Sequence, residues 1–269
     1  MVNVAGCAID CRGAMRDDLI ALGYLIVRPM HRDSFFSAEL VPELIVSAST
    51  CLCRQFPGDY AIDWCSVTDL ERAQKLADFG IDPDQQSAAR IWATENFDEL
   101  FGWPGTFYSL GAAIEARTTL IPPATDVRVL GLGVHEAGLE DFLRHAAPTP
   151  PSEGYAPQGE TGSFTMAKRR ERLVAGGRIL GFEILNLEFG HASHTWLCNQ
   201  LETHCANVLG IRPNAAGFIE TFDDAQRCCA EISRDEVGSE PGPWLPFALV
   251  DYEGLRREQI QAGLRAPPS

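Results

Sequence analysis

Residues 127–134 have the sequence Val-Arg-Val-Leu-Gly-Leu-Gly-Val and mark the point at which the character of the chain changes. A short run of β-branched and aliphatic residues of this kind predicts a buried strand. Pro122 and Pro123 come just before it and end any preceding helix. A helix is expected to follow, from about residue 138 to 147. We therefore place a boundary near residues 122–124.

The part of the chain before this boundary shows mainly helical patterns. Thr68 and Glu71 form a capping box, and the residues up to 79 place apolar side chains at helical spacing. Two further helices are predicted at 87–100 and 109–117, and a short strand is predicted at 24–27. The pattern of residues 40–53 fits either a helix or a strand. Residues 1–123 are therefore predicted to be mostly helical.

The part after the boundary mixes strands and helices. Two more strands are expected at 178–189 and 245–252, and two more helices at 193–209 and 223–232. Residues 148–163 hold four prolines and three glycines, which predicts a flap or a linker. The predicted fold class is α+β, in which residues 124–269 form a small mixed sheet packed by helices. A single composite domain is the alternative to a division into 1–123 and 124–269.

The composition excludes several classes of function. The 269 residues include 22 basic and 37 acidic side chains, which gives a net charge of −15. The charge is distributed, since residues 1–123 carry −8 and residues 124–269 carry −7. Nucleic acids and anionic membranes are therefore disfavoured as partners, whereas a basic protein is favoured. The sequence also lacks the run of about 18 apolar residues that a spanning helix needs.

The cysteines and the basic residues give clues about the source and the compartment. Only two of the basic residues, Lys75 and Lys168, are lysines, which suggests a GC-rich bacterial coding sequence. The N-terminal residues lack the basic and apolar regions of a secretory signal. A cytoplasmic location is therefore expected, with the nine cysteines as reduced thiols.

The densest group of reactive side chains lies between residues 191 and 205. If residues 193–209 form a helix, His194, Cys198 and Glu202 follow one another at intervals of four and share one face. These three side chains are the main catalytic candidates, as a thiolate–imidazolium pair with a carboxylate. His191, His194 and Cys198 are the metal candidates, because imidazole and thiolate are typical zinc ligands.

A structural interpretation of the same segment is favoured. Leu197, Leu201 and Cys205 would form the apolar stripe of the helix, and Ser193 is a natural N-cap. No CxxC or HExxH pattern occurs in the chain, so the spacing matches no standard zinc motif.

His135 and Glu136 form a second candidate acid/base pair. They follow the predicted strand 127–134 directly, at a position where catalytic side chains often lie. Gly131 and Gly133 begin a dinucleotide-binding pattern, but its third glycine would fall on Glu136, so no such cofactor is expected.

The other cysteines carry weaker signals. Cys228 and Cys229 fall on the apolar face of a short predicted helix and are expected in the core. The remaining five form CxxxC and CxC spacings that only weakly indicate a metal site, and they are Cys7, Cys11, Cys51, Cys53 and Cys65.

The sequence leaves two functions open. The first is a non-catalytic cytosolic protein that binds a basic partner, of an immunity, inhibitor or regulatory type. The alternative is a small-molecule enzyme that uses the His/Cys/Glu group near residues 191–205, with zinc as an optional cofactor and residues 148–163 as a lid.

Overall fold

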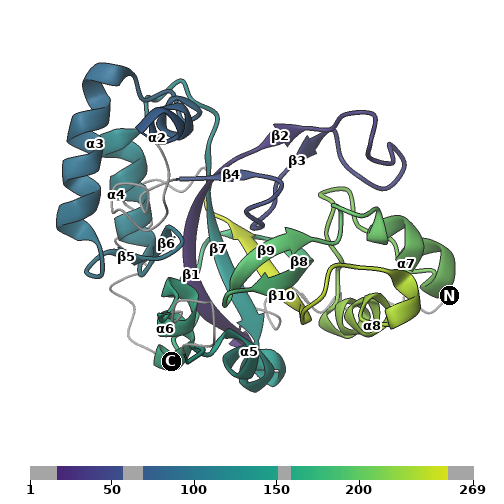
Figure 1. Ribbon diagram of the computed structural model, residues 1–269. Coiled ribbons are helices and arrows are strands. Elements are labelled where there is room, and N and C mark those ends of the chain that lie inside the picture. The colour runs from purple at the N-terminus through teal and green to yellow at the C-terminus, as the bar shows by residue number, and fades with distance from the viewer. Residues whose placement is uncertain (1–16, 57–68, 151–158, 254–269) are drawn as a thin grey trace, which may run out of the picture.

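The computed structural model describes residues 17–56, 69–150 and 159–253. Its centre is an antiparallel sheet with the strand order β5-β6-β1-β7-β10-β8-β9, in which β4 also pairs with β1 (Figure 1). The four long strands are β1 (Leu19–Arg28), β7 (Arg128–His135), β10 (Trp244–Asp251) and β8 (Arg178–Glu188). The shorter ones are β4 (Arg54–Gln55), β5 (Phe101–Gly102), β6 (Thr106–Phe107) and β9 (His191–Thr195). A separate pair consists of β2 (Met30–His31) and β3 (Leu44–Ile45).

Helices cover both faces of the sheet, and three groups of helices are distinct in Figure 1. Along β10, Phe247 and Leu249 point into a core with α5 and α6, whereas Ala248 and Val250 point to the opposite face. That opposite face packs on α2, α3 and α4 at one end and on α7 and α8 at the other. The helices are α2 (Asp69–Ala77), α3 (Pro83–Asn96), α4 (Leu110–Leu120), α5 (Leu139–Ala146), α6 (Gly162–Arg169), α7 (Leu201–Leu209) and α8 (Phe222–Ile232). Two 3-10 turns, η2 (Glu136–Gly138) and η3 (Asp235–Val237), complete the described elements.

Burial on both faces explains why the long strands are almost continuously apolar. Nine of the ten residues of β1 are buried. A bulge at Gly23 shifts its register against β7, and this glycine has a φ of +122° that other residues rarely adopt. Because of the bulge, Leu22 and Leu25 contact the same core although they are three positions apart.

The prediction of a mostly helical N-terminal half with a small mixed sheet after it is wrong. β1 is an interior strand of the sheet, between β6 and β7, and every pairing between the described strands is antiparallel. The short strand expected at 24–27 is part of a ten-residue strand. A strand that is buried on both faces lacks alternation, and Gly23 interrupts its apolar run, so local patterns indicate only its second half.

Strands from both sides of residues 122–124 belong to one sheet and meet where β1 pairs with β7 along most of its length. The division into regions 1–123 and 124–269 stays a prediction, because strand pairing does not test independent folding. Thr68 and residues 151–158 of the expected flap lie outside the described residues. Within the described ranges, no helix has both the length and the apolar character that a bilayer crossing requires.

Candidate thiol site

The segment between β3 and β4, residues 46–53, lies against the edge of the sheet. The backbone N–H of Thr50 donates to the carbonyl oxygen of Ala192 (3.2 Å), and that of Cys51 donates to Ser193 (3.1 Å). Ala192 and Ser193 belong to β9, the last strand of the sheet. These bonds occupy an edge that would otherwise be unpaired, and they place Cys51 beside the turn that follows β9.

That turn connects β9 to α7 and carries Cys198. Two neighbouring side chains anchor it, because Trp196 is fully buried and Leu197 is 4% exposed. The backbone N–H of Trp196 donates to Ile184 of β8 at 3.0 Å, and Cys198 N–H donates to the Thr195 carbonyl at 2.9 Å. Cys198 is therefore held half-buried on a turn whose base is fixed in the core.

The two sulfur atoms meet at the edge of the sheet. Cys51 Sγ lies 2.7 Å from Cys198 Sγ, although the residues are 147 positions apart. This separation falls between the ~2.05 Å of a disulfide bond and the about 3.8 Å expected for two thiolates on a tetrahedral zinc ion. A ring nitrogen of His194 completes a group of three ligand atoms within 4.8 Å of one another. Cys51 is the most exposed member of the group.

The hydrogen bond between the sulfurs makes the pair asymmetric. Donation by the Cys198 thiol stabilises a thiolate at Cys51 and lowers the pKa of Cys51 below its usual range. The same interaction raises the pKa of Cys198. Ser49 and the nearby His194 add to the stabilisation of the Cys51 thiolate. The thiolate form is therefore favoured at the exposed sulfur.

A buried carboxyl group is connected to Cys51 by hydroxyl groups. Glu183 of β8 is 2% exposed, and it accepts hydrogen bonds from the Ser47 hydroxyl (2.5 Å) and from the Ala48 N–H (2.9 Å). Ser47 Oγ lies 2.8 Å from Ser49 Oγ, which lies 3.6 Å from Cys51 Sγ. Burial raises the pKa of Glu183 to about 7. A chain of polar atoms thus runs from the core to the exposed thiol.

Two glutamates flank the imidazole of His194. Its Nε2 lies 4.0 Å from Glu188 Oε2, and its Nδ1 lies 3.8 Å from Glu240 Oε1. Each carboxylate is held in turn by a neighbour, because Ser193 Oγ donates to Glu188 (3.0 Å) and Asn199 Nδ2 donates to Glu240 (2.6 Å). Such carboxylates can orient a histidine ring.

The sequence-predicted candidates are only partly brought together. His194 and Cys198 do meet, but the helix starts at Leu201, so they lie on β9 and on the turn after it. Glu202 is fully buried at the start of α7 and accepts a hydrogen bond from Thr203 (3.0 Å). Burial raises its pKa, and it does not belong to the group of three ligand atoms.

The other metal candidate, His191, packs against an aromatic ring instead. It starts β9, and its ring meets Trp103 edge-on with the centroids 4.7 Å apart. Burial lowers the pKa of His191 to about 4, so this imidazole is neutral at pH 7. Its Nδ1 is buried without a hydrogen-bond partner among the described residues.

His135 and Glu136 lie elsewhere on the sheet. The His135 ring stacks on Phe222 at 4.2 Å and its Nδ1 accepts from Ala137 N–H, which caps the following 3-10 turn. Glu136 pairs with Arg172 at 2.8 Å. β10 and β8 separate β7 from β9, a distance of about 14 Å across the sheet. This pair therefore does not reach the thiols.

The remaining described cysteines are buried in the core. Cys53 follows Cys51 by two residues but is 1% exposed. Cys205, Cys228 and Cys229 pack between α7, α8 and the sheet, as their apolar stripes indicate. Cys7, Cys11 and Cys65 lie outside the described residues.

Cys51 is the site residue that the spacing of residue types indicates only weakly, through the CxC pattern that it forms with Cys53. One local signal is present, since the segment Ser47-Ala-Ser-Thr-Cys-Leu-Cys53 places a small polar or thiol side chain at every second position. That period is typical of extended chain with one polar face. It predicts that the hydroxyl and thiol side chains of this segment share one face, but it does not predict which element of the fold that face contacts.

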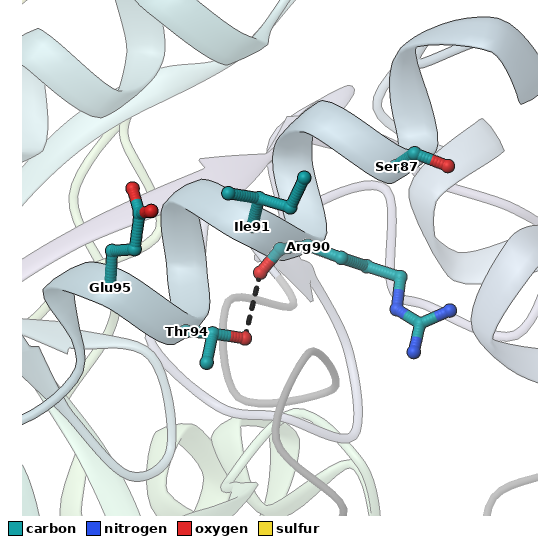
Figure 2. A pocket seen from close by; sticks show the side chains of 5 residues that line it. All are labelled: Ser87, Arg90, Ile91, Thr94 and Glu95. Atoms are coloured by element: carbon teal, nitrogen blue, oxygen red, sulfur yellow. Dashed lines mark hydrogen bonds between the residues drawn. The ribbon is translucent and has the colours of Figure 1, made fainter.

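A surface hollow on α3 is a separate feature. Figure 2 shows that it is lined by side chains of this helix alone, namely Ser87, Arg90, Ile91, Thr94 and Glu95. The Thr94 hydroxyl donates to the Arg90 carbonyl oxygen at 2.9 Å, so that polar group is already satisfied within the helix. The hollow contains none of the site residues.

The sequence and the structure were compared with known proteins. No family model, no curated protein and no solved structure matches this chain.

Proposed function

We propose that the protein carries out thiol–disulfide exchange through Cys51 and Cys198. One observation carries this proposal: the two sulfur atoms lie 2.7 Å apart, and one of them is exposed to solvent. A pair at this distance closes to a disulfide with a movement of about 0.7 Å. The exposed member can meet a substrate, whereas the half-buried member lies within reach to resolve the product.

The proposed substrate is a small or peptide disulfide, R–S–S–R. The Cys51 thiolate attacks one sulfur of the substrate, forming a Cys51–S–S–R bond and releasing one thiolate RS⁻. Cys198, as it loses its proton, then attacks the Cys51 sulfur. The Cys51–Cys198 bond forms, the mixed disulfide breaks, and the second RS⁻ takes up a proton. Two electrons pass from the cysteine pair to the substrate, which is reduced to two thiols.

The surroundings of the pair support this chemistry. The row Ser47–Ser49 connects Cys51 to Glu183, a carboxyl group that can exchange a proton near neutral pH. Hydrogen bonds from Thr50 and Cys51 to β9 fix the backbone that carries the nucleophile. Such preorganisation favours one reactive arrangement of the two sulfurs.

Peptide mapping after thiol chemistry tests the proposal. Brief alkylation of the reduced protein at neutral pH is expected to modify Cys51 well before Cys53, which is buried two residues away. Treatment with an oxidised low-molecular-weight thiol is expected to yield a Cys51–Cys198 disulfide in the wild type. In Cys198→Ser the mixed disulfide at Cys51 should accumulate, and in Cys51→Ser neither product should form.

Cys53→Ala is the matched control, since it removes a thiol from the same segment and leaves the pair intact. It is expected to retain both the fast alkylation of Cys51 and the disulfide. Equal alkylation rates at Cys51 and Cys53, or no Cys51–Cys198 disulfide under oxidation, would overturn the proposed function.

A second proposal is that the acidic surface binds a basic protein. Its support is the distributed net charge of −8 and −7 in the two halves of the chain. We also propose a cytoplasmic location, since a dithiol that reduces disulfides needs a reducing compartment to be regenerated.

A further inference from the structure

We infer that the reduced site also binds Zn²⁺ through Cys51, His194 and Cys198, and that oxidation of the thiol pair releases the ion. The release step rests on the proposed function, whereas the metal site rests on the ligand geometry.

The types of the three ligands select the metal. Two thiolates and one imidazole are the donors that zinc prefers, whereas magnesium and calcium take oxygen ligands. The three atoms lie within 4.8 Å of one another and come from three separate segments, the β3–β4 segment, β9 and the turn after it. Each of these segments is fixed by backbone hydrogen bonds, so the three ligands are preorganised in the metal-free protein.

The sulfurs must separate to admit the ion. Zinc at about 2.3 Å from each thiolate needs them about 3.8 Å apart, compared with 2.7 Å in the structure. Cys51 is exposed, so rotation of its side chain can provide this opening without disturbing the core. The exposed side of the group then leaves a fourth position for water, as in zinc sites that are not purely structural.

Glu188 and Glu240 suit the histidine to this role. They lie 4.0 and 3.8 Å from the two ring nitrogens of His194. Whichever nitrogen binds the ion, the other has a carboxylate within reach that can accept its proton. Ser193 and Asn199 hold these carboxylates in place. Negative charge gathered at the site also favours a divalent cation.

Zinc binding and disulfide formation compete for the same two sulfurs. A disulfide substrate that oxidises the pair takes two electrons from the zinc-bound thiolates. The Cys51–Cys198 bond forms, two RS⁻ leave, and Zn²⁺ is released for lack of its sulfur ligands. Bound zinc is therefore expected to slow the exchange reaction, and oxidation is expected to empty the metal site.

Metal titrations of the reduced full-length chain test the inference. Co²⁺ is expected to bind with a thiolate-to-cobalt absorption band, and one equivalent of Zn²⁺ should abolish the band. His194→Ala should weaken zinc binding by more than about tenfold, and Glu240→Gln by about tenfold. His145→Ala is the matched control, because this histidine lies on α5 and contacts Asp141. The zinc affinity of His145→Ala should equal that of the wild type.

Two further readouts separate this inference from the proposed function. His194→Ala should still form the Cys51–Cys198 disulfide, which shows that the thiol pair is intact while the metal site is lost. Oxidation of the zinc-loaded wild type should release one equivalent of zinc to a colorimetric chelator. Absence of the cobalt band, or zinc affinity unchanged in both His194→Ala and Cys198→Ser, would overturn the metal site alone. Zinc binding without any disulfide would overturn the proposed function and the release step, but not the site.

Discussion

The buried carboxyl group of Glu183 should make the stability of the protein depend on pH in an unusual direction. Its pKa is about 7 in the fold, against an ordinary value of 4.5. A raised carboxyl pKa means that the folded state binds the proton more tightly than the unfolded state does. The free energy of unfolding therefore falls as the pH rises from about 4.5 to about 7. A carboxylate that is paired in the fold has the opposite effect at lower pH, because its contribution to stability grows as the pH rises towards its ordinary pKa and is constant above it.

The size of the effect follows from the two pKa values. Each pH unit of difference corresponds to about 1.4 kcal/mol, so ionisation of Glu183 costs the fold about 3 kcal/mol. For a chain of this size the cost corresponds to a fall of about 6–12 °C in Tm. Glu183→Gln removes the titrating group. Its amide can still donate to Ser47, and its carbonyl oxygen can accept from Ala48.

The assay is reversible urea unfolding of the reduced, chelator-treated protein at pH 4.5 and at pH 8. From pH 4.5 to pH 8, the unfolding free energy of Glu183→Gln minus that of the wild type is expected to rise by about 3 kcal/mol, because only the wild type loses stability when Glu183 ionises. Glu115→Gln is the control, because Glu115 is exposed on α4. Its stability should follow that of the wild type at both pH values. A difference between wild type and Glu183→Gln that stays the same at both pH values would refute the raised pKa and its cause in burial.

Three further predictions concern the core, the sheet and the surface. Trp196→Ala should reduce the unfolding free energy by about 3–5 kcal/mol in a urea titration, because it empties a fully buried site; an unchanged stability would contradict the packing. Gly23→Ala should cost about 2–4 kcal/mol by the same measurement, since its φ is +122° and a Cβ would lie 2.3 Å from the Thr106 side chain; wild-type stability would disprove the strain. A pull-down from lysate should retain a basic partner at low salt and lose it at high salt; no partner at either salt concentration would count against the acidic-surface proposal.

Elements with a complete local signal could be predicted from the sequence. α4 and α8 begin after Ser109 and Thr221, whose hydroxyls cap the first turn. β7 and β8 occupy segments whose apolar content indicates strands. In each case the deciding interactions lie within a few residues, so a window of the sequence contains them.

The long interior strand β1 does not have such a signal. β1 is buried on both faces and pairs with β7, more than a hundred positions later in the chain. Its apolar run is broken at Gly23, where the absence of a side chain permits the close approach of Thr106. The partner strand and the packed helices stabilise β1, and neither is visible in the local pattern. Local patterns therefore predict a helical N-terminal half, although its longest strand is an interior strand of the sheet.

The candidate site also combines features that the sequence determines with features that only the tertiary structure determines. The sequence by itself determined the acidic charge, the residue types and the neighbourhood of His194 and Cys198, because these depend on composition and short spacing. Only the tertiary structure decided that Cys51 joins them, since hydrogen bonds between the β3–β4 segment and the edge of β9 bring together sulfurs that are 147 residues apart. It also decided that Glu202, His135 and Glu136 do not join, because α7 starts too late and two strands lie between β7 and β9. Chemistry at this site depends on distances of a few ångströms, and contacts between distant segments set those distances.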